Sequence, residues 1–256
     1  MNILFLGSGT STGIPSLCCD CDVCQSDDPK NKRLRSSILI HENGHHLLID
    51  TSTDLRQQCL VHGISYINYV LYTHHHADHV HGIDELRSFN HFNSTVIPCY
   101  GNRNTIATIR AKFDYIFNRT TQAGGGLPKL TLNSLNGETF SLGGVLVTPF
   151  DILHGNLTIL GYKFNNCAYI TDCSGIPNTS REKLKHLDIL IINAVGFDPH
   201  PTHFALSQAL EAIEDLQPKR AILTHINHTY DHKKVSEQLP ENIELAYDGM
   251  NVQACD

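Results

Sequence analysis

A histidine-rich run near residue 75 constrains the fold more than any other feature of this chain. Residues 74–80 read HHHADHV and follow the apolar tetrapeptide YVLY, which is typical of a strand. Residues two apart on a strand point to the same side, so His74 and His76 can converge on one point. Asp78 and His79 stand where the chain bends into a helix, and they can face a second point nearby. A purification tag would lie at a terminus and would not contain an aspartate.

Imidazole and carboxylate side chains in this pattern indicate a metal site. They suit zinc, manganese or iron, and two such ions close together form a hydrolytic centre. Two ions need further ligands, which must come from the ends of other strands. Each candidate alone is more typical of a surface or capping residue, but four strand ends with such residues favour a binuclear centre. The three further candidates are His154 after the apolar segment 145–150, Asp172 after 167–171 and His225 after 219–224.

Four of the nine cysteines lie in residues 18–24, which read CCDCDVC. Thiols this close cannot easily pair without strain, but three of them in a C-x-C-x-x-C pattern can bind one zinc ion and need a fourth ligand from elsewhere. A crowded loop of reduced cysteines and a redox site are the alternatives. The other five are scattered beside apolar residues, as is typical of free buried thiols: Cys59, Cys99, Cys167, Cys173 and Cys255.

Short β-rich segments alternate with helical patterns along the whole chain. This order predicts an α/β fold in which two sheets are sandwiched between helical layers. No repeat or linker divides the sequence, so we expect one domain over residues 1–256. The glycine-rich stretch 124–128 is expected to be a loop near the substrate entrance. The predicted strands are 2–6, 37–41, 46–50, 68–73, 95–100, 129–132, 138–142, 145–150, 158–164, 167–171, 188–195, 219–224 and 243–247, and the predicted helices are 53–62, 80–90, 102–117, 180–186, 205–217 and 231–239.

Charge and length limit the expected partners and location. The 256 residues carry a formal net charge of −7, and the densest basic cluster, residues 30–35, is short and isolated. Proteins that bind long polyanions usually carry a basic stripe, so we do not expect nucleic acid as the main substrate. No apolar run of about eighteen residues occurs, so we expect no membrane-spanning helix. The first residues lack the basic leader of a signal peptide, which makes a cytoplasmic location the default expectation.

These motifs resemble those of the metallo-β-lactamase superfamily of hydrolases. Over nearly the whole length the chain is similar to the PhnP family of cyclic-phosphate phosphodiesterases, which are related to the tRNA 3′-processing nucleases. The matching stretches are residues 7–10 (GSGT), the cysteine loop, residues 48–50 (LID), the histidine motif and the strand-end residues. The resemblance implies an αββα sandwich of two β-sheets with helices on both outer faces.

The resemblance also implies a role for each candidate residue. Asp50 would support the metal ligands, and Asp78 would both bind metal and orient the attacking water. His203 would contact the phosphate and serve as a candidate proton donor. Asn193 stands where the family has an aspartate, which affects the polarisation of its partner. The implied ligands are His74, His76, His154 and Asp172 for one ion, Asp78, His79, Asp172 and His225 for the other, and Cys19, Cys21, Cys24 and His228 for a structural zinc, with Cys18 as a spectator.

The implied function is hydrolysis of a small cyclic phosphate, of the phosphoribosyl 1,2-cyclic phosphate type. Two divalent ions, zinc or manganese or iron, would lower the pKa of a shared water to about 7 and supply hydroxide. We therefore expect a small phosphodiester as partner, no membrane, and a homodimer by analogy with relatives. The alternatives are a cyclic-nucleotide phosphodiesterase, a tRNA 3′-processing endonuclease, a thioester hydrolase and a non-catalytic binding protein of the PqqB kind.

Overall fold

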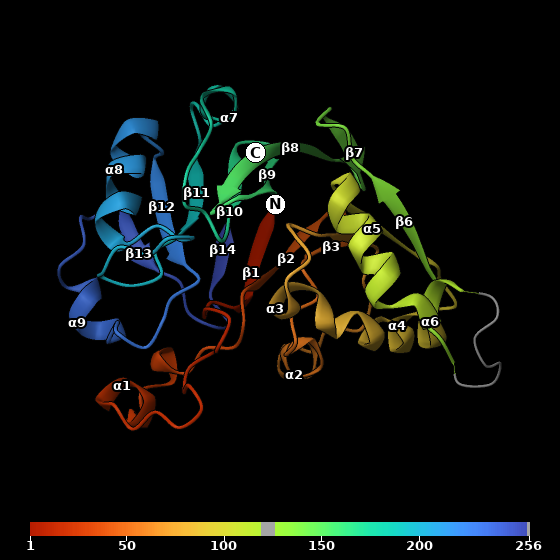
Figure 1. The fold of residues 1–256 in the computed structure, drawn as a ribbon, viewed down its shortest axis with the longest axis horizontal. Helices are drawn as coiled ribbons and strands as arrows, with labels where there is room; N and C mark the ends of the chain where they lie inside the picture. The colour runs from red at the N-terminus through yellow and green to blue at the C-terminus, as the bar shows by residue number, and fades with distance from the viewer. Residues whose placement is uncertain (119–125, 255–256) are drawn as a thin grey trace.

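Two β-sheets lie face to face at the centre of the molecule (Figure 1). The computed structural model describes residues 1–118 and 126–254, and in these ranges each sheet has seven strands. The first sheet has the order β14 (Asn251–Gln253), β1 (Asn2–Gly7), β2 (Ser37–Glu42), β3 (His45–Ile49), β4 (Tyr69–Leu71), β5 (Ile97–Gly101), β6 (Leu130–Ser134). The second has the order β13 (Ile243–Leu245), β12 (Arg220–Thr224), β11 (Ile189–Asn193), β10 (Cys167–Ile170), β9 (Leu157–Phe164), β8 (Val145–His154), β7 (Phe140–Leu142).

The two sheets share one pattern of pairing, although the sequence carries no visible repeat. In the first sheet the pairs from β14 to β3 are antiparallel and those from β3 to β6 are parallel. In the second sheet the pairs from β7 to β10 are antiparallel and those from β10 to β13 are parallel. Parallel strands deliver the residues that follow them to one edge of a sheet, which is where α/β proteins place their sites.

Alternating apolar residues build the core between the sheets. Ile38 and Ile40 of β2 face the second sheet and pack in one cluster with Tyr162 and Ile191. Leu39, between them in sequence, belongs instead to the cluster on the outer face of the first sheet. Side chains on a strand alternate in direction, so a run of consecutive apolar residues buries both faces of the sheet.

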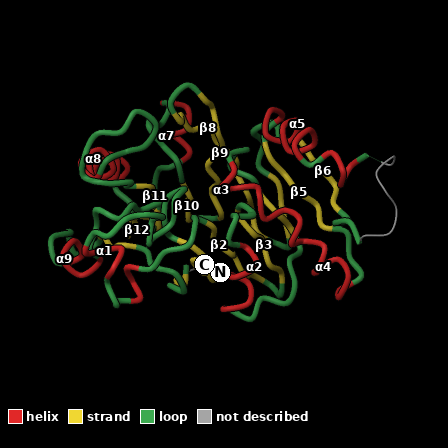
Figure 2. Tube along the Cα trace, turned by 60° about the horizontal axis from the view of Figure 1, so that its bottom comes forward, coloured by secondary structure: helices red, strands yellow, loops and turns green. Residues whose placement is uncertain are grey.

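Helices cover both outer faces, which confirms the αββα sandwich (Figure 2). The helices α2 (Leu55–Val61), α4 (Leu86–Asn93) and α5 (Arg103–Lys112) pack on the first sheet, and α6 (Asp114–Phe117) follows α5. The helices α7 (Asn178–Lys183), α8 (Leu206–Leu216) and α9 (His232–Ser236) lie along the second sheet. None of the helices in the described ranges is both long enough and apolar enough to cross a membrane.

The prediction of one helix over residues 80–90 is wrong. The chain there forms α3 (Ala77–Val80), a 3-10 turn over His81–Glu85, and then α4. Gly82 explains the break, because a Cβ at this residue would lie only 2.1 Å from the carbonyl oxygen of Ser52. The backbone N–H of Gly82 donates a hydrogen bond to the carbonyl oxygen of Thr51 at 3.0 Å, so the chain is bonded here to another segment.

Other boundaries also differ from the predictions. The strand predicted over residues 145–150 continues to His154, since residues 151–154 alternate between exposed and buried and pair with β9. The predicted helix over 102–117 is divided at Phe113 into α5 and α6. Strand β14 and helix α1 (Asp22–Gln25), which lies in the cysteine loop, had no predicted counterpart. In the predicted glycine-rich loop 124–128, residues 124 and 125 lie outside the described residues.

Candidate metal centre

The ends of parallel strands from both sheets meet at one edge and carry the candidate site. Asp50 follows β3, Asp172 follows β10 by one residue, and His225 follows β12. All three adopt the left-handed backbone conformation, with φ of 64°, 53° and 57°. Such a conformation is strained for residues other than glycine and persists where surrounding contacts fix it, as at functional sites.

One group of ligand-type atoms comes from His74, His76 and His154, and these atoms lie within 4.8 Å of one another. His74 and His76 flank one residue of the loop after β4, as the spacing predicted, and their ring centroids are 4.6 Å apart. His154 arrives from the end of β8 in the other sheet. Its Nδ1 lies 2.8 Å from the carbonyl oxygen of Thr202 and therefore carries the hydrogen, which leaves Nε2 free to bind a cation.

A second group lies beside the first and consists of Asp78, Asp172 and His225, again with ligand-type atoms within 4.8 Å. Nε2 of His79 lies 3.1 Å from Oδ2 of Asp78 and 3.2 Å from Oδ2 of Asp172. Nε2 of His225 lies 3.3 Å from Oδ1 of Asp172. Asp172 thus touches histidines with both oxygens, and it also groups with His74 and His79, so it stands between the two clusters.

Asp50 supports the two clusters through hydrogen bonds to His79 and Thr73. Its Oδ2 accepts a hydrogen bond from Nδ1 of His79 at 2.7 Å, and both of its oxygens accept hydrogen bonds from Thr73 at 2.8 Å. Thr73 in turn contacts Nδ1 of His74 at 3.0 Å. Asp50 is completely buried, so its contacts fix both histidines without competition from water.

The electrostatics of the cluster favour a cation. Burial lowers the pKa of His74 well below its usual value, with a further contribution from His79. Burial also acts to lower the pKa of His79, but Asp78, Asp172 and Asp50 outweigh it and raise that pKa well above its usual value. The carboxylates around His79 therefore favour positive charge at this point.

The buried nitrogens provide a direct test of whether metal ions fit here. Among the described residues, Nε2 of His74 is buried and forms no hydrogen bond, whereas Nε2 of His79 faces the carboxylates of Asp78 and Asp172. A buried polar atom without a partner is costly and rare in a native structure. Both nitrogens point into the cluster of carboxylates and imidazoles, so divalent cations fit the donors that this chain supplies.

His203 lies at this site, as the sequence analysis expected. Its side chain is 12% exposed, its Nδ1 is 3.7 Å from Oδ1 of Asp172, and its ring centroid is 4.9 Å from that of His154. Burial, together with His225, lowers the pKa of His203 to about 3, so in this state the ring is neutral and presents one N–H donor. Nδ1 forms no hydrogen bond to the described residues, which leaves this nitrogen available to a ligand.

Several side chains that fix the ligands were not identified from the sequence. Oγ of Ser36 lies 3.2 Å from Nδ1 of His225, and Oγ1 of Thr10 lies 3.1 Å from its Nε2. His200 is exposed, and its ring lies 4.9 Å from that of His203. Only Thr10 had a signal in the sequence, because it belongs to the GSGT stretch that resembles the family.

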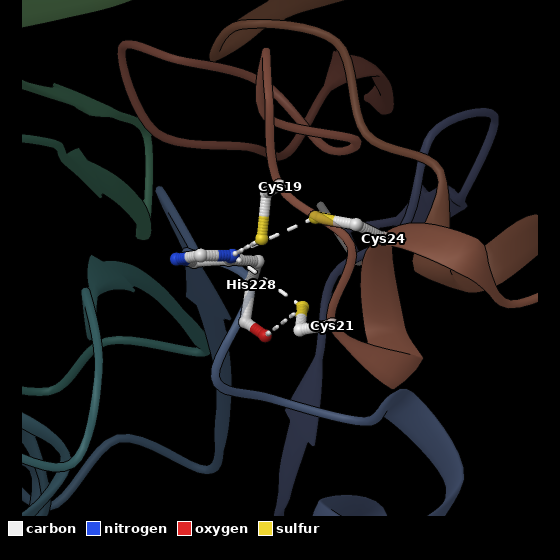
Figure 3. A group of neighbouring side chains, drawn as sticks. All are labelled: Cys19, Cys21, Cys24 and His228. Atoms are coloured by element: carbon white, nitrogen blue, oxygen red, sulfur yellow. Dashed lines mark hydrogen bonds between the residues drawn. The ribbon is translucent and has the colours of Figure 1, made fainter.

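The cysteine loop and His228 come together as the resemblance implied (Figure 3). The sulfurs of Cys19, Cys21 and Cys24 lie 3.0, 3.6 and 3.5 Å from Nδ1 of His228, around one point. The backbone N–H of Cys24 contributes most to lowering the pKa of Cys21, to about 7, whereas burial raises that of Cys24 to about 11. Three sulfurs and an imidazole nitrogen are a donor set typical of structural zinc. Cys18 is exposed and outside this group.

Four of the scattered cysteines are buried, as predicted, namely Cys59, Cys99, Cys167 and Cys173, and Cys255 lies outside the described residues. Cys173 follows Asp172 directly, and burial raises its pKa to about 12. Its thiol is therefore protonated at neutral pH and is a poor nucleophile.

Comparisons with known proteins agree with this geometry. Residues 45–226 match the family model of the beta-lactamase superfamily domain. The crystal structure of a diphosphatase from the PhnP family is 38% identical with a TM-score of 0.92, over 99% of this chain and 97% of that one. Zn²⁺-bound PqqB from Methylobacterium extorquens has a TM-score of 0.81 over 99% of this chain and 100% of that one, and its 20% identity shows a shared fold alone.

Another relative is named as an acyltransferase and not as a phosphate-cleaving enzyme. The octanoyltransferase of Porphyromonas gingivalis (strain ATCC BAA-308 / W83) is 37% identical over 254 residues, which are 98% of this chain and 51% of that protein. The chain thus spans about half the length of this relative. The family match over most of the chain and the 38% identity along a PhnP-family structure agree on one assignment, that this chain belongs to the metallo-β-lactamase superfamily and, within it, to the PhnP family.

Proposed function

We propose that this chain is a metal-dependent phosphodiesterase that hydrolyses a small cyclic phosphate, of the phosphoribosyl 1,2-cyclic phosphate type. The observation that carries the proposal is the convergence of two groups of ligand-type atoms that share Asp172, with His203 beside them. The 38% identity to a PhnP-family protein supports a phosphate-containing substrate. A shared carboxylate between two cation sites is the arrangement that phosphoryl-transfer enzymes use.

Each of the two groups would bind one cation. His74, His76 and His154 would hold one ion, and Asp78, His79 and His225 the other, with Asp172 shared. When bound, such ions supply Lewis acidity and make hydroxide available near neutral pH. Asp50, through its hydrogen bonds to Thr73 and His79, keeps the ligand nitrogens aimed at the ions.

The remaining residues act on the substrate. Hydrolysis of a cyclic diester forms one bond from hydroxide oxygen to phosphorus and breaks one P–O bond, and the departing sugar oxygen takes up a proton. His203 stands between the ligand histidines and the exposed rim, where its N–H can donate to a phosphoryl oxygen or to the departing oxygen. Asp78, 12% exposed, is placed to orient the attacking oxygen.

A second candidate activity is hydrolysis of a diphosphate. The PhnP-family relative at 38% identity is described as a diphosphatase, and its chain is covered to 97%. Cleavage of a P–O–P bond uses the same attack of hydroxide on phosphorus, with a phosphate in place of the sugar oxygen as leaving group. The same donors would serve both reactions, so the substrate has to be found by assay.

The name octanoyltransferase does not transfer readily to this chain. That relative is about twice as long, and the chain matches 51% of it. A covalent acyl carrier needs an activated nucleophile, whereas the cysteine next to Asp172, Cys173, is buried and has a pKa raised to about 12. An acyl thioester belongs in the assay panel nonetheless, because thioester hydrolysis is one of the alternative functions that the family resemblance implies.

The test is a substrate panel measured after reconstitution with zinc, manganese or iron. It compares cyclic ribose phosphates, cyclic nucleotides, dinucleoside diphosphates, precursor tRNA and an acyl thioester, with bound metal quantified in each preparation. We expect cyclic ribose phosphates to give the largest kcat/KM and Asp172→Asn to abolish turnover. The matched control is Asp188→Asn, which removes the same charge beside Lys219, outside the metal-ligand groups.

Three results would overturn the proposal. Turnover of diphosphates alone would leave the second candidate, and turnover of the thioester alone would move the chain to a different reaction class. If two ions are bound per chain and no panel member is hydrolysed, the chain is a binding protein of the PqqB kind.

A further inference from the structure

The loop that follows β1 brings a buried threonine, Thr10, to the metal centre. The side chain belongs to a residue that is only 7% exposed. Its backbone N–H donates to the carbonyl oxygen of Ile226 at 3.0 Å, and its own carbonyl oxygen accepts the N–H of Gly13 at 2.9 Å. Ile226 directly follows the candidate ligand His225, so the backbone of Thr10 is fixed beside that ligand. Only the hydroxyl group is left free to turn.

The hydrogen bonds around His225 decide which of its two nitrogens carries the hydrogen. Nδ1 faces the hydroxyl oxygens of Ser36 at 3.2 Å and Thr171 at 3.4 Å. The hydroxyl of Ser36 donates its hydrogen to the carbonyl oxygen of Gly9, and that of Thr171 donates to Oδ2 of Asp172. A hydroxyl has one hydrogen, so both groups can only accept from Nδ1. The neutral ring therefore carries its hydrogen on Nδ1, and Nε2 has a free lone pair.

Thr10 donates its hydroxyl hydrogen to this lone pair. Its Oγ1 lies 3.1 Å from Nε2 of His225, and because Nε2 has no hydrogen, the hydroxyl is the donor. Within residues 1–118 and 126–254 the hydroxyl of Thr10 has no other hydrogen-bond partner. Nε2 is also the atom that would bind a cation, and one lone pair serves either a hydrogen or a metal ion. When that nitrogen binds a cation, the hydroxyl hydrogen is freed beside it, in a buried place where a donor without a partner is costly.

The side chains that surround this hydroxyl offer more acceptors than donors. Asp78 and Asp172 present only acceptor oxygens, and a nitrogen that binds a cation cannot donate. The oxygens of a phosphoryl group are acceptors too, so a phosphate at the centre needs donors. The N–H of His203 is one of them, and its ring stacks on that of His225 with centroids 5.0 Å apart. Thr10 and His203 thus both flank the ring of His225, and the freed hydroxyl is a second donor.

We propose that Thr10 is a further substrate-binding residue, whose hydroxyl donates a hydrogen bond to a phosphoryl oxygen once Nε2 of His225 binds a cation. This inference rests on the proposed function and adds a contact to the scissile phosphate from the loop after β1. The hydroxyl then has a partner in both states, His225 in the metal-free protein and the phosphate in the loaded one. Thr10 itself makes and breaks no covalent bond.

An effect on His225 alone is the competing explanation. A hydroxyl that only positions this ring would alter the affinity for the metal ion, and its loss would leave phosphate binding to the loaded protein unchanged. A hydroxyl that contacts the phosphate would do the reverse. Separate measurement of the two affinities therefore distinguishes the roles without any turnover.

The experiment compares Thr10→Val and Thr10→Ser with the wild type. Calorimetry with inorganic phosphate on the zinc-loaded protein gives the anion affinity, and competition with a chromogenic chelator gives the zinc affinity. In Thr10→Val we expect phosphate affinity to fall about 10- to 100-fold, the range for a hydrogen bond to a charged group. Zinc affinity should stay within about threefold, since valine removes one contact from the metal-free state and one from the loaded state. Thr10→Ser keeps the hydroxyl and should bind phosphate within about threefold of the wild type.

Thr224→Val is the matched control. Thr224 directly precedes His225 and is completely buried, and its hydroxyl has no hydrogen-bond partner among the described residues. Both affinities should stay within about threefold in this variant. If Thr10→Val does not fold, Thr10→Ala removes the same hydroxyl with a smaller side chain, and the expected result is the same.

The outcomes separate this inference from the proposed function. Unchanged phosphate affinity in loaded Thr10→Val overturns the inference, as does an equal loss of phosphate and zinc, the same loss in Thr224→Val or a failure of serine to restore binding. A loss of phosphate affinity confined to Thr10→Val, with zinc retained and with rescue by serine, supports it. Failure of the wild type to hydrolyse any cyclic phosphate would contradict the proposed function and leave the phosphate affinities to decide the role of Thr10.

Discussion

Replacing Asp50 with asparagine should weaken metal binding and leave the fold intact. Asp50 touches no ion in the proposed scheme, but its Oδ2 contacts Nδ1 of His79 at 2.7 Å and Oγ1 of Thr73 at 2.8 Å. Asparagine is isosteric and tolerates the φ of 64° at this position, so the backbone need not change. The substitution therefore isolates the effect of one acceptor oxygen and one charge.

The size of the effect follows from the hydrogen bonds. If the amide nitrogen takes the place of Oδ2, it faces the N–H of His79, and the ring must lose the contact or move its hydrogen to Nε2, the nitrogen needed for a metal. If it takes the place of Oδ1, it faces the backbone N–H of Thr73. A hydrogen bond to a charged group contributes about 1.5–3 kcal/mol, and 1.4 kcal/mol is tenfold in a binding constant. We expect a loss of about 10- to 100-fold in metal affinity, in line with other residues that support metal ligands.

The assay is competition for zinc with a chromogenic chelator, together with thermal unfolding of the metal-free protein. Burial raises the pKa of Asp50, which means that its charge destabilises the metal-free fold, so the variant should unfold at an equal or higher temperature. Asp54→Asn is the control, because Asp54 pairs with Arg35 and contacts none of the ligands. Zinc affinity within twofold of the wild type in Asp50→Asn would refute the reasoning.

Four further substitutions test other parts of the molecule. His203→Ala should lower kcat by about 10²–10⁴-fold while metal content stays unchanged, whereas His76→Ala should also lose metal; equal metal loss would count against a catalytic role for His203. Cys21→Ser should remove one zinc per chain and lower Tm by roughly 5–10 °C, since each kcal/mol shifts Tm by about 2–4 °C at this size; two ions in a fully active wild type would contradict it. Burial raises the pKa of Asp248 to about 6, so its stabilising contribution is complete below about pH 4 and is lost as the pH rises through 6. The free energy of unfolding of the wild type relative to Asp248→Asn should fall over that interval by about 1.4 kcal/mol per pKa unit, and a constant difference from pH 4 to 7 would show the carboxyl to be unperturbed.

The sequence predicted the positions of the site well because the site is built from strand ends. Each apolar strand is recognisable from its composition, and a histidine or aspartate directly after it can only lie at the edge of a sheet. Asp172 and His225 were found in this way, and the structure brings both to the same point. The cysteine loop was equally visible, because its three candidate cysteines lie within residues 19–24, whereas His228 was implied only by the family resemblance.

Contacts between distant segments could not be predicted in this way. Ser36 and Thr202 fix the rings of His225 and His154 across 189 and 48 residues, and neither has a distinctive neighbourhood in the sequence. The break in the helix after the histidine run was missed for a related reason. Gly82 looks tolerable in an isolated helical pattern, and its hydrogen bond to the carbonyl oxygen of Thr51 comes from a distant segment that the pattern does not reveal.

Asn193 shows how such distant contacts change the interpretation of a substitution. The family resemblance implied an aspartate at this position, so that asparagine would mean a lost carboxylate. In the structure the side chain joins two loops of the site: Oδ1 accepts the backbone N–H of Cys173 at 2.7 Å, and Nδ2 donates to the carbonyl oxygen of Phe204 at 3.5 Å. These neighbours directly follow Asp172 and His203. A carboxylate could make the first contact but would place a negative oxygen against the second carbonyl, so asparagine can hold both loops where aspartate could hold only one. The amide also leaves one negative charge fewer near His203. Burial already lowers the pKa of that histidine to about 3, which keeps its ring neutral. In this chain Asn193 therefore positions Asp172 and His203 relative to each other.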